Sequence, residues 1–306
     1  MQVKEYILHE KSVEKQGDNI YLRFCSNALR FTIRYQVSNV VNGYFPHVGI
    51  TAREGLALLW REHIEDPEQN IPWKPIDLIC RDTETEINMS HLIRRGQTYE
   101  IAVYGPILAC LDKVSVLVKN DELFSVPDVK YERNILVLGG RKTFGIGVTS
   151  SSMMFSNIIR RNHEVRLKRI AVSDNNFLKD IYDQTADIED ISSYDTVIFE
   201  IDAQGQDDRI VREYLESTLK LFAKAKHVVL WHAVKETVWK RKQEIRTLIG
   251  SVSQQYNSFS YLDLNCLFSP EYADMCTYSV NFINDAANIL IYQAIEKELE
   301  TYLWNT

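Results

Sequence analysis

The sequence lacks the features that mark several common classes of protein. It has no excess of positive charge, because 35 Lys and Arg residues stand against 42 Asp and Glu residues, for a net charge of -7. A chain without a positive field does not attract polyanions, so we expect no broad binding to nucleic acid or to an anionic membrane. No apolar run is long enough to span a bilayer, and the first residues lack the apolar segment of a signal peptide.

Cysteine is sparse and scattered, which argues against two further classes. The five cysteines form no Cys-x-x-Cys pair, and their odd number does not suggest a disulfide framework. No two histidines stand at metal-ligand spacing on one element, so we expect no metal site, and no motif requires a cofactor. Together these absences predict a cytoplasmic protein with reduced thiols, without metal, cofactor, nucleic-acid partner or membrane contact.

Short alternating segments dominate the first part of the chain. Apolar and polar residues alternate with period two in several stretches between residues 19 and 118, which places each apolar set on one face of a sheet. The clearest set is Ile20, Leu22 and Phe24. Many short strands with few helical windows predict an N-terminal, jelly-roll-like β-sandwich over residues 1–125. Residues 52–63 fit either a strand or a helical turn.

After a junction near Pro127, apolar strands alternate with amphipathic helices. Predicted strands cover residues 135–138, 169–172, 195–201, 227–231 and 259–264. Predicted helices cover residues 176–184, 209–226, 238–255 and 284–303. Strands separated by helices imply a parallel sheet covered on both faces, so residues 126–306 are predicted to form an α/β domain. Basic residues within 235–247 are expected to form a solvated helix face.

The most informative stretch follows the first strand of this second domain. The apolar residues 135–138 run directly into Gly139, Gly140, Arg141 and Lys142, and two more glycines follow. A buried strand, a tight loop and a helix start in this order form the corner at which α/β folds usually build their sites. The glycines match neither the Walker pattern nor the dinucleotide-binding fingerprint, so a nucleotide loop is not favoured.

From residue 134 onward the chain resembles the SGNH/GDSL hydrolases, a family of esterases, lipases and acyl-sugar deacetylases. Several glycines and Thr143 stand where the first block of the family often has them, and Asn284 matches the residue that opens the last helix. The resemblance implies a flavodoxin-like, three-layer α/β/α SGNH domain with a parallel sheet. The β-rich first part is similar in architecture to the β-sandwich that precedes the SGNH domain in some carbohydrate esterases.

The chain departs from the family at all three positions of the catalytic triad. The resemblance implies a serine nucleophile, a histidine base and an orienting aspartate where this sequence has Arg141, Phe282 and Ser279. Arginine stays protonated at neutral pH and cannot act as a nucleophile, and phenylalanine cannot accept a proton. On this alignment the triad is degenerate and no catalytic residue is expected.

Other positions of the family motifs are better preserved. Ala171 replaces the glycine of the oxyanion hole, Asn175 is retained, and Gln204 replaces the asparagine that donates to the oxyanion. The candidate ligand-binding residues of the cleft are therefore Gly140, Arg141, Lys142, Ala171, Asn175, Gln204 and His232.

Arg141 and Lys142 precede a helix start, where cationic side chains and backbone N–H groups would converge on an anion. A carboxylate, a phosphate or an acidic peptide side chain would fit there. Alternatively, Arg141 only fills and neutralises an abandoned pocket. Both interpretations stay open on the sequence alone.

Other residues could rebuild a hydrolytic site, but each has a simpler explanation. The serines at 150–152 lie just past the loop, and helix capping or solvation accounts for them better than nucleophilic attack. His232 follows a buried strand at the edge of the sheet where ligands bind, and it fits a structural or a catalytic role. Asp202 fits a base, an orienting acid or a solvated loop residue.

The leading hypothesis is a catalytically degenerate SGNH-hydrolase-like protein, a pseudoenzyme that binds a peptide or a glycan. It would act as an accessory protein in a biosynthetic pathway, with a pathway enzyme as an expected partner. The alternative is an active SGNH-type esterase or O-acyl (acetyl) transferase that uses other residues, for instance Ser150 with His232. A purely structural subunit is a third hypothesis.

Overall fold

The structure is a computed structural model of the 306-residue chain. It describes residues 2–10, 20–40, 48–63, 71–79, 83–172, 177–188, 190–201, 207–256, 258–277 and 282–304. The chain divides into two compact units. The first comprises Met1–Val129 with Thr149–Ser152, and the second comprises Lys130–Val148 with Met153–Thr306.

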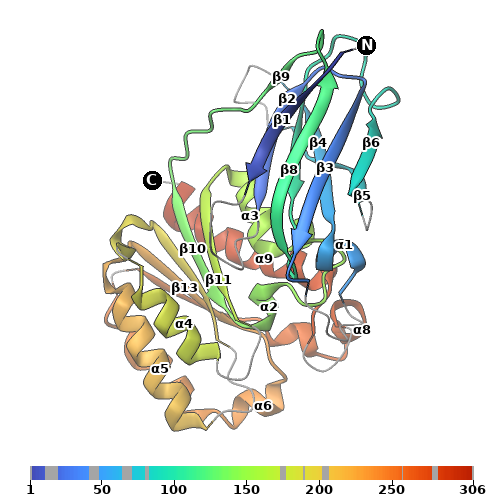
Figure 1. The fold of residues 1–306 in the computed structure, drawn as a ribbon. Helices are drawn as coiled ribbons and strands as arrows, with labels where there is room; N and C mark the ends of the chain where they lie inside the picture. The colour runs from blue at the N-terminus through green and yellow to red at the C-terminus, as the bar shows by residue number, and fades with distance from the viewer. Residues whose placement is uncertain are drawn as a thin grey trace. The chain divides into compact units, whose positions relative to one another are not determined.

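Two antiparallel sheets form the described part of the first unit (Figure 1). The four-stranded sheet has, in spatial order, β1 (Val3–Glu10), β8 (Cys110–Lys119), β3 (Arg30–Ser38) and β6 (Glu84–Asn88). The five-stranded sheet has β5 (Lys74–Ile79), β4 (Leu56–Glu62), β7 (Tyr99–Tyr104), β2 (Tyr21–Ser26) and β9 (Phe124–Ser125). Side chains from both sheets, such as Phe31 of β3 and Ile101 of β7, share one buried cluster. The two sheets therefore pack face to face.

The predicted β-strands of the first unit are confirmed and pair in an antiparallel manner, whereas a jelly-roll connection of these strands stays a prediction. Residues 52–63, which fitted either a strand or a helical turn, contain both. A short helix α1 (Ile50–Glu54) ends at Gly55, and β4 begins at the next residue.

A five-stranded sheet forms the centre of the second unit. Its strands are, in spatial order, β11 (Arg166–Ala171), β10 (Asn134–Gly139), β12 (Thr196–Glu200), β13 (His227–His232) and β14 (Phe259–Asp263). Every neighbouring pair of strands is parallel. The predicted parallel sheet is therefore confirmed.

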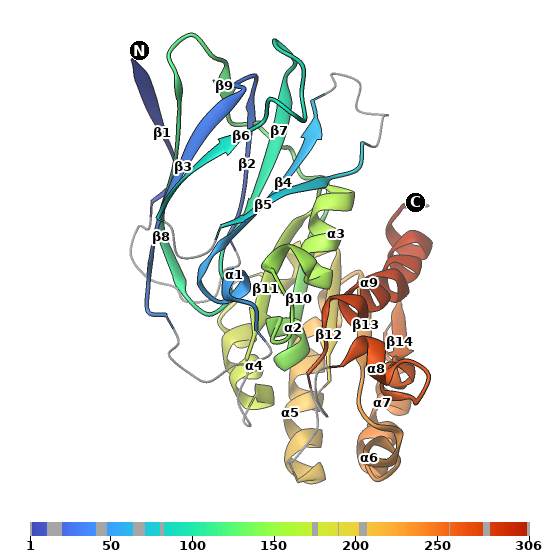
Figure 2. The ribbon, with the colours of Figure 1, turned by 90° about the vertical axis from the view of Figure 1, so that its right-hand side faces the viewer.

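Helices cover both faces of this sheet (Figure 2). The longer helices are α3 (Phe155–His163), α4 (Phe177–Ala186), α5 (Asp208–Leu221), α7 (Gln243–Ser253) and α9 (Asp285–Leu299). Single-turn helices are α2 (Arg141–Phe144), α6 (Glu236–Lys240) and α8 (Ala273–Cys276). Leu136 and Leu138 of β10 face a cluster with α4, α5, α6 and α7, whereas Ile135 and Val137 face α3 and α9. This alternation gives the predicted three-layer α/β/α arrangement.

Short 3-10 turns connect several of these elements. They are η1 (Ser151–Met153), η2 (Ile191–Ser193), η3 (Phe222–Lys224) and η4 (Asn265–Phe268). A wider turn, η5 (Glu300–Trp304), follows α9.

The prediction of one continuous helix over residues 238–255 is wrong. The single helix expected over 238–255 is two helices, α6 and α7, with a break between them. The basic residues of 235–247 therefore do not share one solvated face. Lys242 is mostly buried, and its Nζ lies 2.5 Å from Oδ1 of Asp208 on α5. Lys240 pairs instead with Glu236 one turn earlier.

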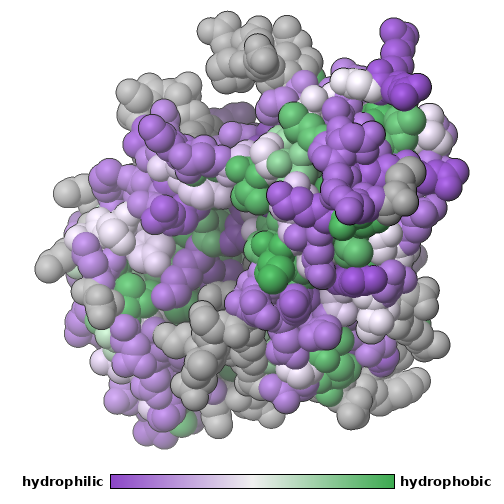
Figure 3. All heavy atoms as spheres, turned by 45° about the horizontal axis from the view of Figure 1, so that its top comes forward, coloured by the Kyte–Doolittle hydropathy of each residue, from purple (hydrophilic) through white to green (hydrophobic). Residues whose placement is uncertain are grey.

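The surface and the thiols complete the description of the fold. Hydrophilic residues predominate on the face drawn in Figure 3, with hydrophobic residues interspersed among them.

In the described ranges, no helix has both the length and the apolarity needed to cross a membrane. The described cysteines, Cys25, Cys110, Cys266 and Cys276, are free thiols, and Cys80 lies outside the described residues.

Candidate functional site at the carboxyl edge of the parallel sheet

Three neighbouring strands bring chemically active residues to one edge of the sheet. β10 ends at Gly139, β12 ends at Glu200 and β13 ends at His232. Because neighbouring strands are parallel, their carboxyl ends meet at the same edge, which is where α/β folds usually bind ligands.

A fully buried ion pair occupies this edge. Lys142 and Glu200 expose 1% and 0% of their side chains, and Nζ of Lys142 lies 3.6 Å from Oε1 of Glu200. The other carboxylate oxygen, Oε2, accepts the backbone N–H of Thr143 at 2.8 Å. Burying two charges is costly unless they are paired and hydrogen-bonded, and here each oxygen of Glu200 faces a positive charge or a donor.

The chain therefore supplies its own anion to the helix start that the sequence predicts as an anion site. Lys142 and the N–H of Thr143, which were expected to face a ligand, bind the carboxylate of Glu200 instead. Arg141 is the first residue of α2 and is half-buried. A ligand contact of Arg141 stays a prediction.

Gly139 is required by the close approach of this ion pair. A Cβ at Gly139 would lie 2.2 Å from Oγ1 of Thr143 and 2.6 Å from Cβ of Glu200. Both distances are far below van der Waals contact, so only glycine allows β12 and α2 to meet here. The glycine that resembles the family motif thus has a structural reason in this chain.

The other end of α2 is held by a second charged residue. Arg169 of β11 is 7% exposed, and its Nη1 donates to the carbonyl oxygens of Thr143 and Phe144 at 3.1 Å each. A carboxylate at the first N–H groups and a guanidinium at the last carbonyls complement the dipole of the turn. Glu200 and Arg169 together fix the position of α2 on the sheet.

The loop after α2 continues toward the start of α9. Gly147 has a φ of 113°, a value that favours glycine. A Cβ at Gly147 would lie 2.0 Å from the carbonyl oxygen of Ile283. The glycine-rich loop and the segment before α9 are therefore in close backbone contact.

His232 is completely buried in an aromatic stack. Its ring centroid lies 3.8 Å from that of Trp239 and 5.4 Å from that of Tyr261. Nδ1 is hydrogen-bonded to the Tyr261 hydroxyl at 2.9 Å, and Nε2 lies 3.4 Å from Oδ1 of Asp263.

Burial lowers the pKa of His232 to about 4. The nearby carboxylate of Asp263 opposes this shift, and the charge of Lys142 adds to it. A buried imidazole loses the hydration of its charged form, so it is neutral at pH 7. Burial also raises the pKa of the Tyr261 hydroxyl, which stays protonated.

The serines after the loop do not have the predicted role. Ser150, Ser151 and Ser152 are all buried, so they are not a solvated cluster. The hydroxyls of Ser150 and Ser152 are hydrogen-bonded to each other at 2.6 Å, and Ser151 donates to the carbonyl oxygen of Gly105. None of the three caps α3, whose N-cap residue is Met154.

Helix α3 is capped from α9 instead. The side-chain oxygen of Asn288, which is 0% exposed, accepts the backbone N–H of Phe155 at 3.1 Å. Asn284 caps α9 by accepting the N–H of Ala287, so its predicted place at the opening of the last helix is confirmed.

The remaining predicted residues fall in different places. Gly140 is the N-cap of α2, and Ala171 ends β11 in register with Gly139. Phe282 is half-buried beside Ile283. Asn175, Asp202, Gln204 and Ser279 lie outside the described residues. The charge of Lys142 acts on the pKa of His232, whereas Ser150 and His232 have different hydrogen-bond partners.

Two residues of this edge are missed by sequence reasoning. Glu200 is an acidic residue that ends an otherwise apolar strand, and Arg169 is a charged residue inside a short strand. Both are usable signals, because a charge at such a position requires a buried partner. In the described part of the chain, no group of three or more His, Cys, Asp or Glu side chains could hold a metal.

Comparison with known proteins supports the fold at low sequence identity. No protein-family model matches the sequence, and no curated protein matches it. A protein of Bacteroides ovatus described as a GDSL-like lipase matches 92% of this chain and 84% of its own, with a TM-score of 0.71 and 14% identity. The salicylyl-acyltransferase SsfX3 of a tetracycline biosynthetic pathway matches 92% and 82%, with a TM-score of 0.61 and 13% identity.

A third similar structure is the acetyl xylan esterase Est2A from the rumen bacterium Butyrivibrio proteoclasticus. The match covers 99% of both chains, with a TM-score of 0.58 and 11% identity. At such identities the similarity concerns the fold alone. The predicted resemblance to the SGNH/GDSL hydrolases is confirmed for the fold of the chain.

Proposed function

We propose that this protein is a non-hydrolysing SGNH-like binding protein. Its ligand would be a peptide or a glycan, and it would serve as an accessory protein in a biosynthetic pathway. The observation that carries the proposal is the buried ion pair between Lys142 and Glu200, which occupies the helix start where the family has its nucleophile. This pair stabilises the loop without providing a reactive group.

The chemistry of the surrounding side chains supports the same conclusion. Ester hydrolysis in this family requires a hydroxyl, an imidazole that accepts its proton and an orienting carboxylate. Thr143, whose N–H donates to Glu200, supplies a hydroxyl beside the ion pair, but this hydroxyl is fully buried and has no hydrogen-bond partner among the described residues. His232 is paired with Tyr261 and has a pKa of about 4, so it is a poor base at neutral pH.

Acetylated xylo-oligosaccharides are a suitable first probe, because one structure of similar fold is an acetyl xylan esterase. Isothermal titration and an acetate-release assay on the same samples separate binding from hydrolysis. We expect binding without release of acetate, and a weaker affinity for Arg141→Ala than for the control Arg95→Ala, which changes an exposed arginine of the first unit. Release of acetate, an absence of glycan binding, or equal affinities of the two variants would count against the glycan proposal.

The alternative is an active esterase or O-acyl transferase. The observation that favours it is the proximity of His232 to Asp263 at the carboxyl edge, together with the similarity in fold to an acyltransferase. Such an enzyme would need a nucleophile other than Arg141, for which Ser150 is the candidate from the sequence. Hydrolysis of p-nitrophenyl acetate that is lost in Ser150→Ala would favour this alternative.

A further inference from the structure

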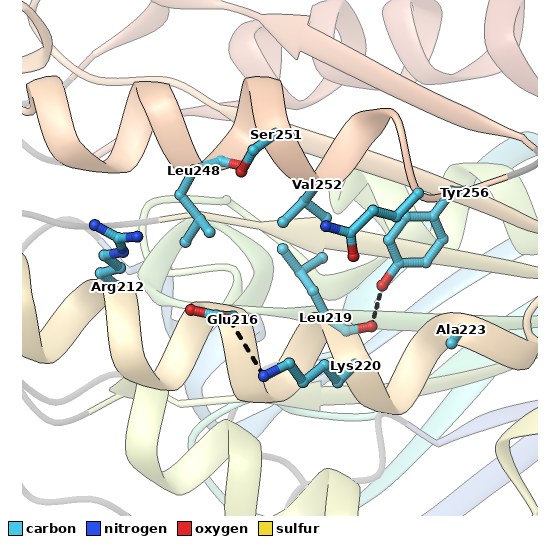
Figure 4. A pocket seen from close by; sticks show the side chains of 10 residues that line it. Arg212, Glu216, Leu219, Lys220, Ala223, Leu248, Ser251, Val252 and Tyr256 are labelled. Atoms are coloured by element: carbon cyan, nitrogen blue, oxygen red, sulfur yellow. Dashed lines mark hydrogen bonds and ion pairs between the residues drawn. The ribbon is translucent and has the colours of Figure 1, made fainter.

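A pocket with a volume of about 210 Å³ lies between α5 and α7 (Figure 4). Residues of α5 at helical spacing form one wall, and residues of α7 with Tyr256 form the other. The pocket shares no lining residue with the ion pair and the aromatic stack at the carboxyl edge. It is therefore a separate feature of the second unit.

Three buried apolar side chains close the floor of the pocket. Leu219, Leu248 and Val252 are 1%, 4% and 5% exposed and line the base of the pocket. The hydroxyl of Tyr256 donates to the backbone carbonyl of Leu219, which holds the aromatic ring against the pocket. Burial raises the pKa of Tyr256 to about 12, so this hydroxyl remains a donor at neutral pH.

Three charged residues line the pocket, and two of them pair with each other, so that Arg212 can pair with a ligand. Glu216 and Lys220 neutralise each other, with Oε1 and Nζ 3.2 Å apart, as the dashed line in Figure 4 marks. Arg212 lies at one end of the pocket, and its side chain extends from α5 toward α7 (Figure 4). Among the described residues, no side chain or backbone group forms a hydrogen bond or an ion pair with the Arg212 guanidinium.

We propose that this pocket binds a small apolar carboxylate. Its apolar group would lie on the floor formed by Leu219, Leu248 and Val252, and its carboxylate would pair with the planar guanidinium of Arg212. The size is appropriate, because a cavity of about 150 Å³ lined by aliphatic side chains holds a benzene ring. A phenyl ring with a short acidic tail therefore matches the pocket in volume and in charge. This proposal does not depend on the function of the carboxyl edge.

A pair of probes with one hydrocarbon skeleton and opposite charge tests the proposal. 3-Phenylpropionate and 3-phenylpropylamine are titrated into the full chain by isothermal calorimetry. We expect the acid to bind about two- to fivefold more tightly than the amine at low salt, because Arg212 is exposed and exposed ion pairs contribute about 0.2–1 kcal/mol. Equal affinities of the two probes would overturn the proposal.

Two arginines of the same helix provide a matched comparison. Arg212→Ala is expected to remove the preference for the acid over the amine. Arg209→Ala is expected to retain this preference, because the Arg209 side chain is 86% exposed and pairs with Asp207 outside the pocket. An equal loss of affinity in both variants would contradict a specific role of Arg212. Circular dichroism establishes that each variant is folded.

A third variant tests the location. Ser251→Trp places a large side chain at the rim of the pocket and is expected to abolish binding of the acid. If this variant is folded and binds 3-phenylpropionate as the unchanged protein does, the ligand lies elsewhere and the proposal fails. If it does not fold, the comparison of Arg212→Ala with Arg209→Ala decides.

Discussion

Lys142 of α2 is almost completely buried. This is possible because the carboxylate of Glu200, at the end of β12, lies beside its ammonium group. An ammonium group without a partner would not remain charged in such a place, and neither would the carboxylate. The sequence alone does not reveal this pair, since the two residues are 58 positions apart and meet only when β10 and β12 are adjacent. The sequence does show that a basic residue stands at the helix start, and from this position we predicted that it binds the anionic group of a ligand.

The ion pair makes the first prediction at the scale of single residues. Lys142→Met leaves the carboxylate of Glu200 buried without its countercharge, so we expect the free energy of unfolding to fall by about 3–5 kcal/mol. Urea unfolding followed by circular dichroism measures this loss. In the double variant Lys142→Met/Glu200→Gln most of the loss should be recovered, because a neutral amide oxygen still accepts the N–H of Thr143.

A control for this prediction is the exposed pair of Lys179 and Asp183, which lie one turn apart on α4. Lys179→Ala is expected to leave stability almost unchanged, since exposed ion pairs are weak and screened by water. If Lys142→Met were as mild as Lys179→Ala, the account of a buried, essential pair would be wrong.

The second prediction concerns how the stability of the protein depends on pH through His232. The pKa of His232 falls from an ordinary 6.5 to about 4 on burial, so between these pH values the unfolded chain binds a proton that the folded chain does not. Stability is therefore full above pH 6.5 and decreases as the pH falls toward 4, by roughly 3 kcal/mol for this group. Below pH 4 both states are protonated, and the contribution of His232 changes no further.

The measurement is a series of urea unfolding curves between pH 7 and pH 4 for the unchanged protein and His232→Gln. The slope of stability against pH should be flatter in the variant. The difference between the two curves isolates His232, which matters because burial also lowers the pKa of His227. Parallel curves would show that His232 does not titrate as described.

At the scale of elements, the contact between α2 and the ends of β10 and β12 depends on the absence of a side chain at Gly139. Gly139→Ala forces a Cβ against Thr143 and Glu200, and we expect a loss of about 1–3 kcal/mol in stability from overpacking. Gly250→Ala in α7 is the matched control. Its Cβ would meet no atom within 4 Å, so it should stabilise the helix by about 0.5–1 kcal/mol. Equal effects of the two changes would contradict the geometry.

The capping of α3 by α9 makes a prediction about the pairing of two helices. Asn288→Ala removes the acceptor of the Phe155 N–H and leaves that buried group unsatisfied, which costs about 1–3 kcal/mol. Thermal unfolding by calorimetry measures the effect. Asn120→Ala, which removes an exposed side-chain hydrogen bond to Gln2, is the control and should change little.

The order of strands and helices is the part of the fold that the sequence predicts best. Within each segment the apolar residues recur either at every second position, as in a strand, or at helical spacing. The break between α6 and α7 was not predictable from the same signals, since no glycine or proline marks residues 241–242. The serines at 150–152 show a second limit. Their composition suggests caps, but burial directs their hydroxyls to each other and to a backbone carbonyl.

At the scale of the whole molecule, two antiparallel sheets and a three-layer α/β/α unit follow each other as they do in structures with 11–14% sequence identity. Such conservation of architecture requires only the pattern of apolar residues and a few glycines. The chemistry of the site depends on single residues, and there this chain has Arg141 and Phe282. The parallel sheet with its covering helices and the β-rich first unit were therefore predictable from the sequence, whereas the internal carboxylate at the site was not.

The central claim is that this SGNH-like protein binds without forming a covalent intermediate. The most direct measurement is the intact mass of the protein after incubation with a fluorophosphonate probe, with an active serine esterase as the positive control. The account predicts an unchanged mass, because neither Arg141 nor a buried, unactivated hydroxyl attacks the probe. A stoichiometric adduct on a serine, absent from its alanine variant, would contradict it.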